Sequence, residues 1–147
     1  MADLIDIDDY KTSENIQSTK DDARISLLIA AVSQLVKTYC GTSLVDFYST
    51  NKAEEFNINW ATNLVQLTEG PINVVNSVEE RDNFGAAYTT VPATQYYLDL
   101  STDSVHRVNT SGSPKSWPTG PGAVRISYTA GYAACPKDLQ LAVIDLI

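Results

Sequence analysis

Nucleophilic catalysis is the first chemistry to test, because the chain holds two cysteines and one histidine. Cys40 and Cys135 stand far apart in the sequence, and His106 is the only histidine that could act as their base. Neither cysteine lies in a nucleophile-elbow context such as GxSxG, so a small cysteine enzyme is only an alternative. We expect both thiols to be free and mostly buried, and His106 to be a strand residue that faces solvent.

Metal and carboxylate chemistry also lacks the residues it needs. The cysteines have no CxxC spacing, so a structural zinc site lacks its ligands. The stretch 6–9 begins like a calcium loop, but Lys11 stands where glycine is needed and Gln17 where the closing glutamate is needed. The paired acids 54–55 and 79–80 would point to opposite faces of a strand. We predict no catalytic, cofactor-binding or metal site, and therefore no enzyme.

Composition favours one acidic globular domain. The chain has 147 residues and is 44% hydrophobic, with a formal net charge of -8. That charge disfavours binding to the phosphate backbone of nucleic acids. A groove for single-stranded nucleic acid would need positive charge beside its aromatic residues, and Arg107, Lys115 and Arg125 are too few to supply it. The N-terminus is acidic where a signal peptide would be basic, and the apolar run 27–32 is too short to span a bilayer. We expect a protein with no membrane partner.

The acidity is concentrated at the start of the chain. The first 22 residues hold seven acids and two lysines, a local charge of -5. We therefore expect an acidic N-terminal arm over residues 1–19, followed by a single domain over residues 20–147.

A long amphipathic helix is predicted over residues 20–40. Ser18 or Thr19 can cap it, Asp21 and Asp22 stand in its first turn, and Gly41 follows its end. Apolar residues at helical spacing should form one buried face: Ile25, Leu28, Ile29, Val32, Leu35, Val36 and Tyr39.

The middle of the chain, residues 43–128, predicts short antiparallel strands. The apolar period changes to 2 after Gly41, and a hairpin-type turn stands at residues 82–85. The expected strands are 44–48, 55–60, 64–67, 72–80, 88–91, 95–100, 105–108 and 123–128. A long irregular loop over residues 109–122, rich in glycine and proline, is expected to have a function or to be mobile.

A second helix is predicted over residues 136–147, with Pro136 suited to its start. It is apolar on nearly every side, so we expect its faces to be covered by another subunit or by chain beyond Ile147. The predicted fold class is α+β: a long N-terminal amphipathic helix packed on an antiparallel sheet of short strands, with a C-terminal helix.

The order of these parts, together with several short motifs, resembles one family. The motifs are YCGTSL at 39–44, LTEGPI at 67–72, YYLD at 96–99, Trp117-Pro118, GAVRISYTAGY at 122–132 and PKDL at 136–139. This set, from residue 21 to 147, is similar to the head-tail connector (adaptor) proteins of tailed bacteriophages.

The resemblance implies a structural virion protein of the phage neck, assembled in the bacterial host cytoplasm. It implies a homo-oligomeric ring, a dodecamer if it matches the portal's symmetry, that joins the DNA-filled head to the stopper or tail. Its partners would be further copies of itself, the portal protein and a stopper or tail-completion protein, while genomic DNA passes through the bore without specific binding. The expected interface residues are Lys115, Trp117, Lys137, Leu139, Val143, Leu146 and Ile147.

Three alternatives stay open at this point. A stopper or tail terminator would also be acidic and ring-forming, although such proteins are usually dominated by sheet, which the long helix disfavours. A small cytoplasmic cysteine enzyme would need Cys40 or Cys135. A generic α+β ligand-binding module would need convergent polar pocket residues, and the sequence does not identify any.

Overall fold

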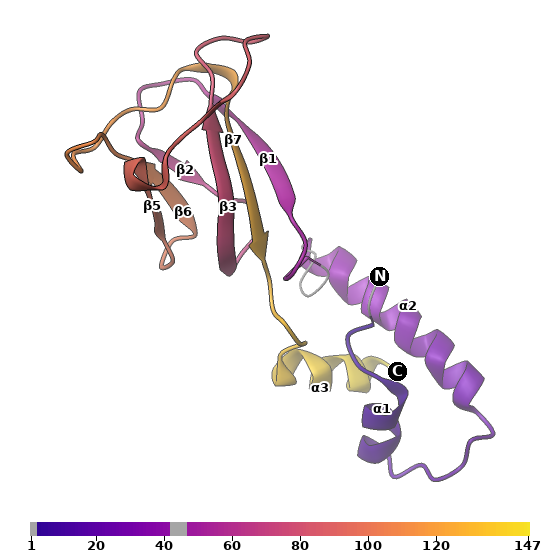
Figure 1. Ribbon diagram of the computed structural model, residues 1–147. Helices are drawn as coiled ribbons and strands as arrows, with labels where there is room; N and C mark the ends of the chain where they lie inside the picture. The colour runs from indigo at the N-terminus through magenta and orange to yellow at the C-terminus, as the bar shows by residue number, and fades with distance from the viewer. Residues whose placement is uncertain (1–2, 42–46) are drawn as a thin grey trace. The chain divides into compact units, whose positions relative to one another are not determined.

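A computed structural model describes residues 3–41 and 47–147 of the chain (Figure 1). The residues group into two compact units, one formed by 1–48 with 132–147 and the other by 49–131. Among the described residues, the first unit, the helical unit, has three helices, and the second, the sheet unit, has seven strands and a short 3-10 helix, η1 (Ala93–Gln95). The α+β class is as predicted. The expected arm over 1–19 and single domain over 20–147 stay a prediction.

The long helix forms as α2 (Asp22–Cys40), with the predicted end but a start two residues later than predicted, and its N-cap is Asp21 instead of Ser18 or Thr19. Gly41 ends it in the left-handed region at φ 67°, and its N–H donates to the carbonyl oxygen of Lys37 at 3.0 Å. It is not the N-terminal element, however, because a short helix, α1 (Ile7–Ser13), precedes it. The Asp6 carboxylate caps α1 by accepting from the backbone N–H of Asp9 at 2.8 Å.

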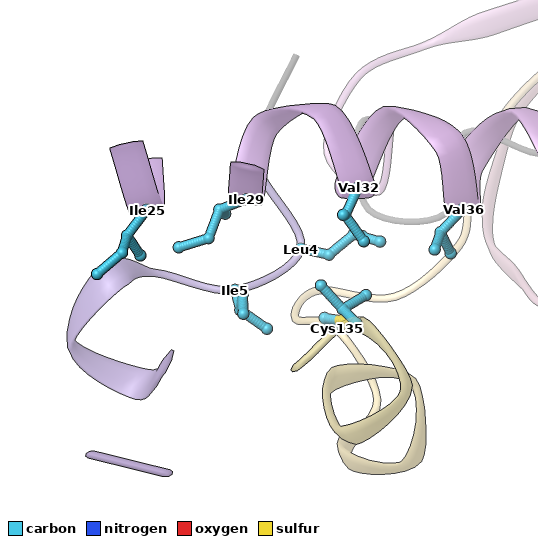
Figure 2. Packing of buried hydrophobic residues seen from close by; sticks show 8 residues of the cluster. Leu4, Ile5, Ile25, Ile29, Val32, Val36 and Cys135 are labelled. Atoms are coloured by element: carbon cyan, nitrogen blue, oxygen red, sulfur yellow. The ribbon is translucent and has the colours of Figure 1, made fainter. Parts of the chain in front are cut away.

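The core of the helical unit is built from α2, the N-terminal segment and α3 (Lys137–Leu146), as Figure 2 shows in part. Leu4 and Ile5 are buried in it, so the segment expected to be a solvated arm supplies core residues. The backbone N–H of Leu4 donates to Ser33 Oγ at 3.0 Å, which fixes this segment on α2. The buried members are Leu4, Ile5, Ile25, Ile29, Val32, Val36, Cys135 and Val143. Packing of α2 against the sheet stays a prediction.

The buried face of α2 is narrower than its apolar pattern. Leu35 is 60% exposed and Tyr39 is 91% exposed, so the expectation that both are buried is wrong. One residue turns the helix by about 100°, which carries Leu35 away from its buried neighbour Val36. Cys40 is exposed and only Cys135 is buried, which also corrects the expectation of two mostly buried thiols.

The sheet unit holds two antiparallel sheets. The larger has the order β1 (Lys52–Ile58), β7 (Gly120–Ala130), β3 (Ile72–Glu80) and β4 (Thr89–Thr90). The smaller has the order β2 (Leu64–Gln66), β6 (Ser104–Arg107) and β5 (Tyr96–Asp99). Antiparallel pairing is as predicted, and β3 has the predicted bounds, whereas β7, with 11 residues, is longer than the predicted strand 123–128. Of the predicted strand 44–48, residues 44–46 lie outside the described residues, and Phe47 and Tyr48 belong to no strand.

Strand β7 is the centre of the larger sheet, because it pairs with both β1 and β3. Ala123 and Val124 are consecutive and both buried, which shows that both faces of the strand are covered here. The predicted turn at 82–85 lies in the connection between β3 and β4, whose register pairs Glu80 with Thr89. The motif GAVRISYTAGY therefore contains most of the central strand.

Helix α3 begins at Lys137, one residue after the predicted start, with Pro136 as its N-cap, and has one buried residue, Val143. The apolar side chains of Leu141 and Leu146 are exposed. Within the described part of the chain, only one side of this apolar helix is covered. No helix among these described residues is long and apolar enough to cross a membrane.

Candidate functional site

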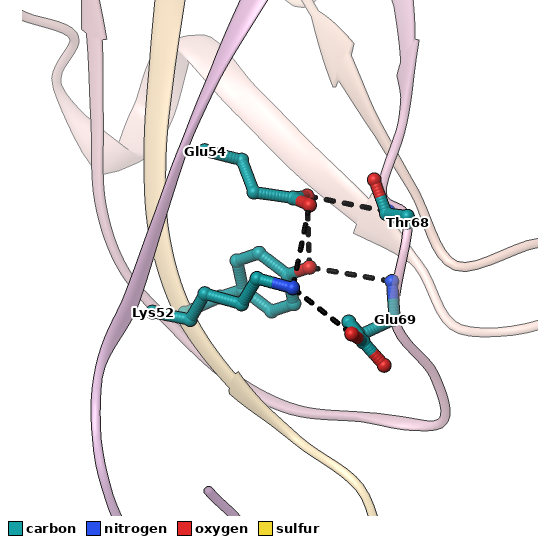
Figure 3. A network of polar contacts seen from close by, with 5 residues as sticks. Lys52, Glu54, Thr68 and Glu69 are labelled. Carbon is teal, nitrogen blue, oxygen red and sulfur yellow. Dashed lines mark hydrogen bonds and ion pairs between the residues drawn. The ribbon is translucent and has the colours of Figure 1, made fainter. Parts of the chain in front are cut away.

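A polar network ties three parts of the sheet unit together (Figure 3). Its centre is Tyr128 of β7, whose hydroxyl donates to Glu54 Oε2 at 2.8 Å and accepts from the backbone N–H of Glu69 at 3.3 Å. The Thr68 N–H donates to the same Glu54 oxygen at 3.3 Å. Lys52 Nζ lies 2.9 Å from Glu69 Oε1 and 3.7 Å from Glu54 Oε1. The segment after β2 is thus held against β1 and β7.

The charges of this network fit a structural role. Burial by itself would raise the pKa of Glu54, but hydrogen bonds from Thr68 and Tyr128 and the nearby charge of Lys52 leave that pKa below its ordinary value. Burial, followed by the hydrogen bond to Glu54, raises the pKa of Tyr128 far above its ordinary value. Near neutral pH, Glu54 is therefore ionised and Tyr128 is a neutral donor, which is the pairing that makes their hydrogen bond strong.

A buried arginine anchors the long loop. Arg107 of β6 makes a two-pronged ion pair with Glu80 of β3, with N–O distances of 2.9 and 3.1 Å. Its Nη1 also donates to the carbonyl oxygens of Val108 at 2.6 Å and Gln95 at 2.9 Å. This one side chain links both sheets to the start of the loop.

The loop itself is well connected and shorter than predicted. Strand β7 begins at Gly120, so the last residues of the expected loop 109–122 form strand instead. Val108 bridges to Pro114, and the Lys115 N–H donates to the Arg107 carbonyl oxygen at 3.1 Å. Trp117 is 2% exposed and its backbone N–H donates to the Thr62 carbonyl oxygen at 2.8 Å. The loop is therefore held at its base and near its end.

The expected interface residues fall in two separate places. In the loop, the Lys115 side chain is exposed, whereas Trp117 is an internal anchor with the Arg107 guanidinium 5.8 Å from its ring centre. On α3, Val143 is fully buried, and Leu139 and Ile147 pack partly against the helical core. Lys137 and Leu146 are exposed, and Lys137 Nζ donates to Gln140 Oε1 at 2.9 Å. Their role in an interface stays a prediction.

Two features of the structure were not expected from the sequence. In the first, the guanidinium carbons of Arg81 and Arg125 lie 4.4 and 4.2 Å from the centre of the Tyr88 ring. The Tyr88 hydroxyl donates to the Gly122 carbonyl oxygen at 2.7 Å. The second is the exposure of apolar residues on α2. Helical spacing signals that second feature, because α2 has more apolar residues than one face can hold.

His106 and the two cysteines, considered above for catalysis, belong to different units: His106 lies in the sheet unit, and Cys40 and Cys135 lie in the helical unit. Ser104 Oγ lies 3.1 Å from His106 Nε2, but Ser104 is completely buried and beyond the reach of a substrate. His106 lies in β6, as predicted, and is partly buried, whereas Val105 and Arg107 beside it are buried; its ring stacks on Tyr97, with ring centres 4.7 Å apart. Burial raises the pKa of the Cys135 thiol, which lowers its reactivity. Residues 3–41 and 47–147 contain no group of three or more His, Cys, Asp or Glu residues placed to hold a metal ion.

Comparison with solved structures finds a similar fold in chains of gene transfer agent (GTA) particles. The chain is similar to a chain in the neck of an empty GTA particle, with 20% identity, a TM-score of 0.62 and coverage of 97% of this chain and 75% of that one. A chain in the neck of a native GTA particle gives 20% identity, a TM-score of 0.58 and coverages of 99% and 79%. A chain in the virion of a native GTA particle has 21% identity and a TM-score of 0.60, with coverage of 97% of this chain and 75% of that one.

Sequence comparison gives the family. No curated protein matches the chain, but the family model for head completion proteins matches residues 3–147. The match spans both units and confirms the predicted resemblance to head-tail connector proteins and the predicted class, a structural protein of the virion neck. The chain therefore belongs to the head completion protein family.

Proposed function

We propose that this protein assembles with further copies of itself into a ring beneath the portal, where it joins the DNA-filled head to the stopper or tail. The observation that carries the proposal is the match of the head completion family over residues 3–147. The similar neck chains come from particles computed with C6 and C12 symmetry, which supports a ring whose copy number follows the portal. We expect twelve copies.

The proposed role of this ring is to bind the neighbouring neck proteins, without catalysing a reaction. The polar networks around Tyr128 and Arg107 connect strands and loop segments of the sheet unit, as expected of a rigid spacer. A rigid sheet unit suits a protein that must hold two large assemblies at a fixed separation. The non-catalytic role belongs to the proposal.

Two surfaces are proposed to contact other neck proteins. The exposed side of α3 carries the apolar side chains of Leu141 and Leu146 together with the charged Lys137, and is assigned to the portal. The exposed tip of the long loop, including Lys115, is assigned to the neighbouring copy or to the stopper or tail-completion protein. The loop is anchored at its base by Arg107, so its tip is presented at a defined place.

Genomic DNA is proposed to pass through the bore of the ring without specific binding. Each copy carries a net charge of -8, so a ring of copies has a large negative charge that repels phosphate backbones. This negative charge favours passage of the DNA through the bore over binding of the DNA to the ring.

Electron microscopy of virions tests the proposal. The protein should form a ring between the portal and the stopper or tail. A ring at the far end of the tail, or between stopper and tail tube, would identify a tail terminator or stopper instead. Absence of the protein from purified virions would refute a neck function altogether.

A further inference from the structure

One side of α2 is apolar and uncovered. We define the outer stripe of α2 as Leu27, Ala31 and Leu35, which are spaced four residues apart and so follow one side of the helix. Leu27 is 71% exposed, Leu35 is 60% exposed, and Ala31 between them is also exposed. The core residues of the same helix, Ile29 and Val32 among them, point into the core of the helical unit (Figure 2). Helix α2 thus has two apolar sides, of which one is buried in the core of the helical unit and the other is exposed.

The outer stripe also lacks the charges that usually mark a solvent-facing helix surface. No charged residue stands between Arg24 and Lys37. Of the polar residues near the stripe, Gln34 donates through Nε2 to Thr38 Oγ1 at 3.1 Å, so the two satisfy each other along the helix. No charged group in this stretch requires contact with water, and a helix that is apolar on several sides is normally covered on those sides.

The chemistry of the stripe fits a second copy of this chain. Two copies that each carry a net charge of -8 repel one another wherever their acidic surfaces meet. A charge-free helical surface is a place where they can touch without bringing carboxylates together. The small side chains of Ala30 and Ala31, both exposed, let a neighbouring backbone approach closely. Every copy in a ring needs contacts with two neighbours, so such a surface is required if the ring exists.

We propose that the outer stripe of α2, centred on Leu27, Ala31 and Leu35, packs against the neighbouring copy of this chain in the assembled ring. This inference rests on the proposed ring and names the surface through which its copies meet.

Charge-introducing substitutions provide the first test. Leu27→Lys and Leu35→Lys each place an ammonium group on the stripe while keeping a good helix former. The matched control is Leu100→Lys, which changes the same residue type at a position 65% exposed in the sheet unit. Virions produced with each variant as the only copy are purified, and the protein incorporated per virion is measured. We expect at least a tenfold loss for both stripe variants and no change for the control, with native circular dichroism for all three. Normal incorporation of the double variant L27K/L35K would overturn the inference.

A photo-crosslinking amino acid at position 27 identifies the occupant directly. It is introduced at Leu27, and at Leu100 as control, and virions are irradiated and analysed for covalent products. The inference expects products at multiples of the 16.0 kDa chain mass from position 27 only. A product with the portal or another protein, or no product, would overturn it.

The two proposals fail separately in this design. If the wild-type protein is present as a ring in the neck but position 27 gives no self-crosslink, the surface is wrong and the proposed function stands. If the wild-type protein is absent from virions, the proposed function fails and the inference fails with it.

Discussion

Replacing Tyr128 with phenylalanine isolates the hydroxyl at the centre of the polar network. The ring of Tyr128 is fully buried and Tyr128→Phe keeps it, so the substitution leaves apolar packing nearly unchanged. It removes the 2.8 Å hydrogen bond to the Glu54 carboxylate and the acceptor for the Glu69 N–H. The free energy of unfolding should therefore report these polar contacts and little else.

The expected loss can be worked from the two bonds. A hydrogen bond to a charged group contributes about 1.5–3 kcal/mol, and Glu54 keeps the Thr68 N–H and the Lys52 charge, which favours the lower half of that range. The Glu69 N–H bond is long at 3.3 Å, so its loss adds about 1 kcal/mol or less. We expect Tyr128→Phe to lower the free energy of unfolding of the sheet unit by about 2–3 kcal/mol.

Urea unfolding followed by tryptophan fluorescence measures this quantity. The two tryptophans of the chain, Trp60 and Trp117, lie within residues 49–131, so their signal follows the sheet unit. The control is Tyr97→Phe, which removes the hydroxyl of a half-exposed tyrosine in the same unit and should change stability by less than about 0.5 kcal/mol. A loss for Tyr128→Phe as small as that of the control would refute the reasoning, because the network would then stabilise nothing.

Three further predictions concern the same unit. Trp117→Ala should lower the free energy of unfolding by about 3–5 kcal/mol, measured by urea unfolding followed by circular dichroism, because a buried ring that packs beside Arg107 is lost. Gly122→Ala should lower the melting temperature, because its φ of 58° disfavours other residues and a new Cβ would lie 2.5 Å from Arg81 Nη2; an unchanged melting temperature would contradict this. The pKa of Glu54 is lower in the folded protein than its ordinary value of 4.5, so its contribution to stability is full above pH 4.5 and is lost as the pH falls through the folded-state pKa. Glu54→Gln should therefore flatten the fall in the free energy of unfolding as the pH is lowered into the acid range. A fall as steep as that of the wild type would contradict the role given to the network.

The elements with a clear local pattern were predictable from the sequence. Helix α2 ends at Gly41 as its capping signals indicate, and β3 has the predicted bounds because its apolar residues and flanking turns mark both ends. The bounds of β7 were less well predicted, because glycine at 120 and 122 resembles loop in sequence although pairing with β1 extends the strand there.

Features that depend on tertiary contacts were not predictable. Leu4 and Ile5 stand among aspartates, and only packing against α2 shows that they belong to a core. Trp117 was expected at an interface, but its backbone N–H donates to the carbonyl oxygen of Thr62, which lies far away in the sequence, and its ring is buried beside Arg107. The sequence shows that α2 has more apolar residues than one helical face can hold. Which of these residues are buried depends on how the N-terminal segment and α3 pack against the helix.

The most direct test of the proposed function is cryo-electron microscopy of the virion neck at a resolution that traces side chains. We predict a closed ring of this chain directly beneath the portal, with twelve copies. Its absence from the head-tail junction, or its presence there as single copies without ring contacts, would contradict the account.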